Sequence, residues 1–133
     1  MEYRTDPGKN VPESPIRTKS LIDSVRYAFR GLFYGFRTER NFMTYLCIIV
    51  VLFVVNLIIG IRPMEHLAFF ICAIGAVSAE FTNTAIEHIA NYLTTDLHES
   101  IRRAKDLGAA AVLVWGFVFF GFEGVLLCRA FFG

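Results

Sequence analysis

Three long apolar stretches alternate with polar segments along the chain, at about residues 42–61, 67–90 and 107–128. Each contains the roughly 20 residues that an α-helix needs to cross a hydrocarbon core of about 30 Å. Gly60 and Pro63 separate the first two stretches and disfavour a continuous helix there. The pattern therefore predicts three transmembrane helices, with a short hairpin after the first and a longer polar loop after the second.

A different periodicity precedes the first apolar stretch. Between residues 20 and 38 apolar side chains recur at steps of three and four residues, while Arg26, Arg30 and Arg37 fall on the opposite side. This pattern predicts an amphipathic helix that lies on the membrane surface, although a helix packed on a soluble core would show it too. Residues 1–18 contain three prolines and no apolar period, so we expect a disordered tail in front of one membrane domain, residues 19–133.

Composition and charge support a membrane protein. Hydrophobic residues make up 55% of the 133 residues, which is high for a soluble domain of this size. Basic residues concentrate before the first predicted span and between the second and third, so the positive-inside rule predicts a cytoplasmic N-terminus. The three cysteines stand singly inside predicted spans, and we expect neither a disulfide nor a metal role for them. We also expect no nucleic-acid partner.

The second predicted span carries an unusual polar stripe in the sequence AEFTNTAIEHIAN, residues 79–91. At 100° per residue, Glu80, Asn83, Thr84, Glu87 and Asn91 fall within an arc of about 100° on one helix face. At 1.5 Å per residue, Glu87 lies at the cytoplasmic boundary of the span and Glu80 about 10 Å inside it. An acidic residue at that depth is costly and needs a partner or a function.

Charged residues from the other spans reach the same membrane edge. Glu39 precedes the first span, and Lys105 and Asp106 precede the third. Two carboxylates, Glu39 and Glu87, together with substrate phosphates suit Mg²⁺, and Lys105 suits phosphate oxygens. Glu80 suits a general base acting on a lipid hydroxyl.

Two structural alternatives remain open at this point. Glu87 could form an ion pair with Arg102 or Arg103. Asn83 and Thr84 could simply link helices by hydrogen bonds. No Walker A sequence and no kinase glycine-rich loop occurs, so a nucleotide would need a different binding site.

Three motifs resemble the small prokaryotic integral-membrane lipid kinases, which comprise diacylglycerol kinase and undecaprenol kinase. They are GLFYGFRTERNF at 31–42, AEFTNTAIE at 79–87 and RRAKDLGAAAVL at 102–113. The resemblance implies an all-α membrane protein that forms a homotrimeric helical bundle, with three spans and one surface helix per chain. It also implies ATP-dependent phosphorylation of a lipid alcohol in the prokaryotic plasma membrane.

The resemblance further implies residue roles. Glu80 corresponds to the family's catalytic base, and Asn83 belongs to the same signature. Glu39 and Glu87 correspond to its magnesium ligands. The positions that match ATP contacts are Tyr27, His98, Lys105 and Asp106, with Asp96 and Leu97 nearby, and Ala109 matches a position near the lipid substrate.

Three positions depart from the family pattern. Ser20 replaces an arginine of the surface helix, and Asn91 replaces an aspartate. Glu123 is not a family feature, and its place near the outer end of the third span predicts that it extends toward the external interface. The strings RTERNF and FTNTAIE look closer to undecaprenol kinase than to diacylglycerol kinase. The competing hypothesis is a non-catalytic membrane accessory protein that uses the polar stripe for oligomer contacts.

Overall fold

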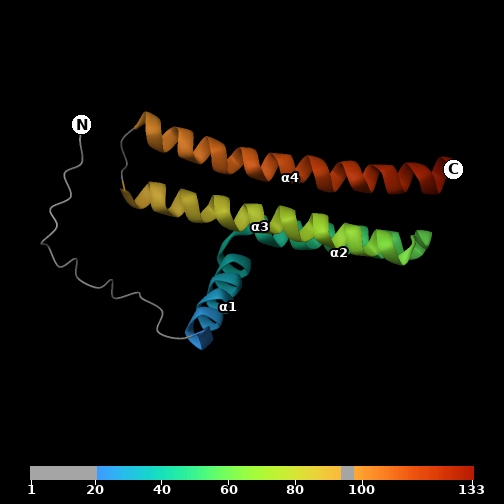
Figure 1. Ribbon diagram of the computed structural model, residues 1–133, viewed down its shortest axis with the longest axis horizontal. Coiled ribbons are helices and arrows are strands. Elements are labelled where there is room, and N and C mark those ends of the chain that lie inside the picture. The colour runs from blue at the N-terminus through green and yellow to red at the C-terminus, as the bar shows by residue number, and fades with distance from the viewer. Residues whose placement is uncertain (1–20, 94–97) are drawn as a thin grey trace, which may run out of the picture. The chain divides into compact units, whose positions relative to one another are not determined.

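The computed structural model describes residues 21–93 and 98–133, and every element in these ranges is a helix. The four helices are α1 (Leu21–Thr38), α2 (Arg40–Ile59), α3 (Pro63–Leu93) and α4 (Glu99–Phe132) (Figure 1). The predicted all-α membrane architecture is thereby confirmed. The expected disordered tail lies outside the described residues.

The chain divides into two units, residues 1–34 and 35–133. The described part of the first unit is most of α1, whose apolar side chains Leu21, Ile22 and Phe29 are exposed. A surface location of this helix stays a prediction. The second unit contains α2, α3 and α4, and the rest of the fold concerns this unit alone.

Helices α2, α3 and α4 are each long and apolar enough to cross a membrane. Their 20, 31 and 34 residues correspond to about 30, 46 and 51 Å at 1.5 Å per residue. The predicted long polar loop between the second and third spans is therefore wrong, because α3 continues to Leu93 and α4 begins at Glu99. Polar pairs three and four residues apart support the first turns of α4, a signal that hydropathy does not detect.

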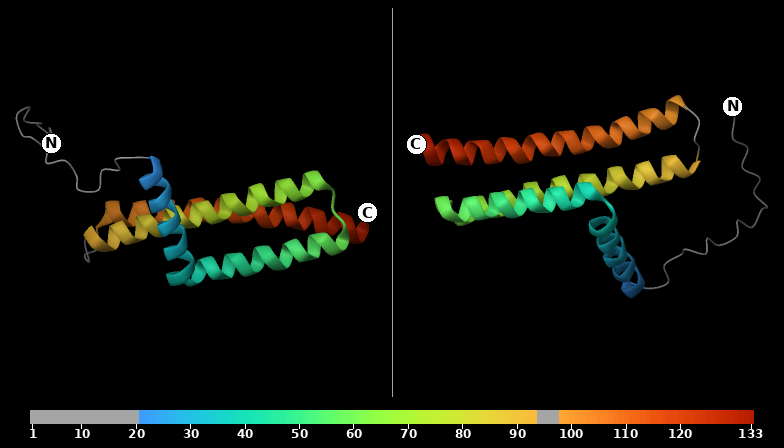
Figure 2. Two further views of the ribbon diagram at one scale, coloured as in Figure 1. Left: turned by 90° about the horizontal axis from the view of Figure 1, so that it is seen from below. Right: turned by 180° about the vertical axis from the view of Figure 1, so that it is seen from behind.

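The apolar core lies where α3 and α4 run side by side (Figures 1 and 2). Phe69 and Ala73 of α3 pack with Phe119 of α4, and residues of α2 such as Leu52 and Phe53 cover this cluster. Farther along the pair, Gly75 lies directly against the indole ring of Trp115, where an added Cβ would overlap the ring. The absence of a side chain at Gly75 therefore permits the close approach of the two helices.

The turn after α2 is stabilised by a glycine in the left-handed conformation and by ion pairs. Gly60 adopts the left-handed conformation, with φ of 69°, and its N–H donates to the Asn56 carbonyl. Glu65, in the first turn of α3, accepts hydrogen bonds from the backbone and side chain of Arg62 and from the guanidinium of Arg129 on α4. The buried carboxylate of Glu65 thus joins the first turn of α3 to the last turn of α4.

Glu123 differs from its prediction. It is 2% exposed, and its Oε2 accepts a hydrogen bond of 3.1 Å from Nδ2 of Asn56, which is fully buried on α2. The side chain faces the neighbouring helices and does not extend to the external interface. Sequence depth alone misplaced it, because depth along a helix does not tell which face meets another helix.

Candidate active site

Glu80 occupies the middle of α3 and is 4% exposed. Its Oε1 accepts a hydrogen bond of 2.9 Å from Nδ2 of Asn41, in the first turn of α2. The start of α2 is held there by Phe42, which is fully buried against Phe81, with ring centroids 4.1 Å apart. Since Phe81 follows Glu80 directly, this aromatic contact fixes the beginning of α2 beside the buried carboxylate.

A cleft adjoins Glu80 and separates α2 from α4. Its first hollow, of about 390 Å³, is lined by Asn41, Thr44, Tyr45, Ile48, Glu80, Val112 and Phe120. Its second hollow, of about 450 Å³, is lined by Tyr45, Ala109, Val112, Leu113, Gly116, Phe117 and Phe120. Because the two hollows share lining residues, we treat them as one site and call it the α2–α4 cleft.

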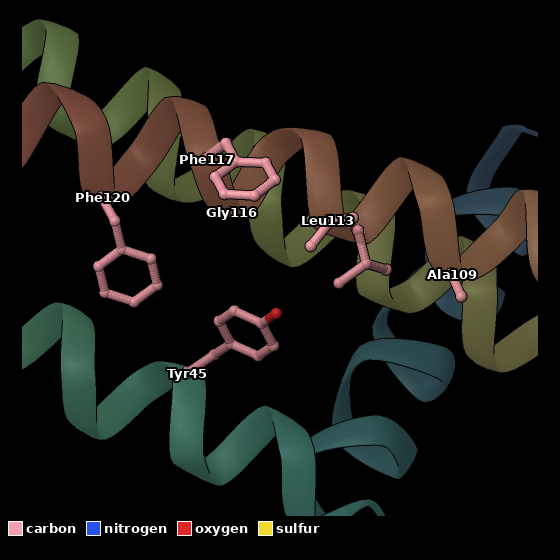
Figure 3. Close-up of a pocket in the computed structure, with 7 residues that line it drawn as sticks. Tyr45, Ala109, Leu113, Gly116, Phe117 and Phe120 are labelled. Atoms are coloured by element: carbon pink, nitrogen blue, oxygen red, sulfur yellow. The ribbon is translucent and has the colours of Figure 1, made fainter.

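Figure 3 shows the side chains of the second hollow. The ring of Tyr45 projects from α2 toward α4 with its hydroxyl inside the cleft, and Leu113 and Phe120 project from α4 toward it. Ala109 lies farther along the same stretch of α4. The predicted base Glu80 and the predicted lipid-side residue Ala109 therefore line one cleft, whose remaining walls are mostly apolar.

Asn83, one turn after Glu80, contacts the other predicted glutamate. Its Nδ2 donates to Oε1 of Glu87 at 3.2 Å, and Glu87 itself is exposed. Its Oδ1 is buried without a hydrogen-bond partner among the described residues and lies against Gly108, where an added Cβ would be 2.5 Å away. Asn83 therefore orients Glu87 and packs on α4, and its amide does not bond Glu80.

Glu39 lies at the junction of α1 and α2, as the residue that precedes the first turn of α2. Its Oε1 lies 3.2 Å from Nε2 of His88, the residue after Glu87. Among the described residues no three His, Cys, Asp or Glu side chains gather closely enough to form a metal site by themselves. Glu39 and Glu87 offer carboxylate oxygens, the ligand type that Mg²⁺ takes together with substrate phosphates and water.

The basic residues at the start of α4 have separate partners. Lys105 Nζ donates to Oδ1 of Asn91 at 3.3 Å. Arg102 donates to Glu99 and to Asp106, and Arg103 donates to Glu99. The alternative ion pair of Glu87 with Arg102 or Arg103 is therefore not formed.

Three further residues belong to this polar region at the start of α4. Glu99 precedes the predicted span, and its hydrogen bonds from Arg102 and Arg103 hold its pKa below the ordinary value. Asp106, the residue after Lys105, accepts a hydrogen bond of 3.0 Å from Arg102. His98 is the residue that precedes the first turn of α4, with an extended backbone.

The described structure does not test the roles of three predicted ATP-binding residues. Asp96 and Leu97 lie outside the described residues. Tyr27 lies on α1 in the first unit, where the guanidinium of Arg30 is 5.9 Å from its ring centre. Their roles remain predictions.

Asn41 and Tyr45 are cleft residues that sequence reasoning missed. A signal was present, because the two residues are four positions apart at the start of the first span and share one helix face. Nothing in the sequence tells which faces of α2 and α3 meet.

Comparisons with known proteins show which family this chain resembles. Residues 26–127 match the family described as prokaryotic diacylglycerol kinase. The chain is 32% identical over 98 residues to undecaprenol kinase of Bacillus subtilis, covering 74% of this chain and 80% of that protein. It is 28% identical over 108 residues to diacylglycerol kinase of Haemophilus influenzae, covering 75% and 92% respectively. A diacylglycerol kinase of Pseudomonas aeruginosa is 27% identical over 96 residues.

Proposed function

The chain belongs to the prokaryotic diacylglycerol kinase family, and from this premise we propose that it transfers the γ-phosphate of ATP to a membrane lipid alcohol. The observation that carries the proposal is Glu80, a buried carboxylate that lines an otherwise mostly apolar cleft between two membrane-spanning helices. The hydroxyl group of a lipid can enter such a cleft from the bilayer, whereas the mostly apolar walls disfavour a water-soluble acceptor.

In the proposed reaction Glu80 is the general base. The lipid hydroxyl oxygen forms a bond to the γ-phosphorus of ATP, while the bond from that phosphorus to the bridging oxygen breaks and ADP leaves with the electron pair. The hydroxyl proton passes to Oε2 of Glu80, since Oε1 is engaged by Asn41. Positioning and charge stabilisation supply most of the rate in phosphoryl transfer, and proton removal adds to them.

The nucleotide is proposed to bind at the exposed end of the polar stripe. Glu39 and Glu87 would hold Mg²⁺, which neutralises phosphate charge during transfer. Asn83 keeps Glu87 in place, and Lys105 offers its ammonium group to phosphate oxygens. This arrangement puts the water-soluble donor at the membrane edge and the lipid acceptor two helical turns deeper. The N-terminus is then cytoplasmic, and the active unit is a homotrimer.

Both undecaprenol and diacylglycerol fit the proposal. The relative from Bacillus subtilis acts on undecaprenol by its name, and RTERNF also favours that substrate. The second hollow is lined by alanine, valine, leucine, glycine and aromatic side chains, which accept isoprenoid and acyl chains alike. The apolar cleft wall therefore favours a lipid acceptor but does not distinguish an isoprenoid chain from an acyl chain.

The test is phosphate transfer from ATP radiolabelled at its γ-phosphate, with purified protein in detergent and Mg²⁺. Undecaprenol and diacylglycerol are offered in parallel, and labelled lipid phosphate is separated by chromatography. We expect transfer to at least one lipid. Absence of transfer to both, with a helical spectrum that shows folded protein, would favour the accessory-protein hypothesis.

A further inference from the structure

Two residues on the first turns of α2 stand beside the proposed base and have no assigned role. Asn41 and Tyr45 lie one helical turn apart, and both line the α2–α4 cleft together with Glu80. Their side chains end in neutral polar groups inside a mostly apolar wall. Such groups are costly in a membrane unless they bind something.

Asn41 fixes one half of the Glu80 carboxylate. Its amide N–H donates to Oε1 at 2.9 Å, across 39 residues of sequence. A carboxylate held at one oxygen presents the other in a defined direction, and a general base must meet its proton within hydrogen-bond reach. Glu80 lines the cleft, so the direction left open to it is the cleft itself.

Tyr45 lines the part of the cleft where an acceptor hydroxyl would bind. It lines both hollows and points its own hydroxyl into the cleft (Figure 3). A phenolic hydroxyl both donates and accepts hydrogen bonds. It can therefore bind a lipid alcohol without competing for the proton that the base removes.

We infer that Asn41 and Tyr45 position the two partners of the proton transfer: Asn41 orients the Glu80 carboxylate, and Tyr45 hydrogen-bonds the lipid alcohol oxygen. Asn41 is thus a positioning residue that acts through Glu80, whereas Tyr45 touches the substrate. The inference rests on the proposed kinase function and adds to it two residues outside the roles implied by the family resemblance.

The test for Asn41 uses two variants that lack the amide donor, Asn41→Asp and Asn41→Leu. We expect kcat to fall by about tenfold to a hundredfold, since small displacements of a catalytic group have effects of this size, with KM for both substrates within about twofold. The matched control is Thr82→Val on α3, whose hydroxyl bonds the Ser78 carbonyl and lies outside the cleft. It should retain wild-type kinetics.

A double-mutant cycle distinguishes positioning from a structural role. In the Glu80→Gln background, Asn41→Leu should change the residual rate by less than about twofold, because the group through which Asn41 acts has been removed. A loss of equal size in both backgrounds would overturn the role of Asn41, as would wild-type kcat in both Asn41 variants.

Tyr45→Phe removes one hydroxyl and keeps the ring. We expect KM for the lipid to rise about threefold to tenfold, the size of one lost hydrogen bond, with kcat and KM for ATP almost unchanged. An unchanged KM for the lipid would overturn the role of Tyr45.

An infrared measurement separates this inference from the proposed function. The carboxylate band of Glu80, identified by its loss in Glu80→Gln, should shift in Asn41→Leu and stay in place in Thr82→Val, whether or not any lipid is phosphorylated. Inactive wild-type protein with the expected shift would refute the kinase proposal, and with it the role of Tyr45, while it would support the contact of Asn41 with Glu80. An unshifted band would refute that contact.

Discussion

Removing the carboxyl group of Glu123 is expected to destabilise the helical bundle, because it would leave the amide of Asn56 buried without a partner. The two side chains are 2% and 0% exposed, and they are joined by a hydrogen bond of 3.1 Å between α2 and α4. Asn56 Oδ1 and Glu123 Oε1 have no further partner among the described residues.

The expected magnitude follows from this burial. An unsatisfied buried polar group costs about 1–3 kcal/mol, so Glu123→Ala should lower the free energy of unfolding by at least that amount. Glu123→Gln keeps an oxygen that can accept from Asn56 Nδ2, and polar pairs in membrane proteins contribute only about 0.6 kcal/mol on average. The glutamine variant should therefore lose less than about 1 kcal/mol.

The assay is reversible unfolding in mixed micelles at fixed protein concentration, for Glu123→Ala, Asn56→Leu and the double variant. Thr82→Val, which changes an exposed side chain, is the control. We expect the double variant to lose clearly less stability than the sum of the two single variants. If the single effects add to the double effect within about 0.5 kcal/mol, the side chains do not interact and the reasoning is refuted.

Two further predictions concern the active site. Glu80→Gln should reduce phosphate transfer to a small residual rate, while nucleotide binding, followed by calorimetry, stays close to wild type. Glu87→Gln should instead weaken the Mg²⁺-dependent binding of ATP, and a strong loss of ATP affinity in Glu80→Gln would contradict its role as base. Gly108→Ala would put a methyl carbon 2.5 Å from Asn83 Oδ1 and should lower turnover at least about tenfold, whereas Gly121→Ala, with open space around it, should stay within about twofold in the same kinetic assay.

The helices were predictable from sequence because hydropathy and helical periodicity depend on local residues. The same periodicity placed Glu80 and Glu87 on one face, and the structure shows one buried and the other exposed. Boundaries were less accurate, since the turns of α3 and α4 beyond the apolar stretches are supported by polar pairs that a hydropathy pattern reads as loop.

Contacts between helices could not be predicted. Asn41 meets Glu80 across 39 residues, and Asn56 meets Glu123 across 67. Both pairs depend on the rotation of α2 about its own axis, and its nearly uniform apolar sequence contains no periodicity that fixes this rotation. A polar residue within such an apolar helix indicates that a contact with another helix exists. It does not indicate which residue of the other helix forms that contact.

The length of α2 has a consequence for the bilayer around the protein. At about 30 Å this helix matches the thickness of the hydrocarbon core, whereas α3 and α4 are longer than the core by about 15 Å or more. A change of bilayer thickness therefore creates a length mismatch along the whole of α2. Asn41 ties one end of α2 to Glu80, and Asn56 ties the other end to α4. A tilt of α2, the shortest of the three candidate spans, is therefore expected to move Glu80, the proposed base, so that lipids of different chain length should change the rate of phosphate transfer.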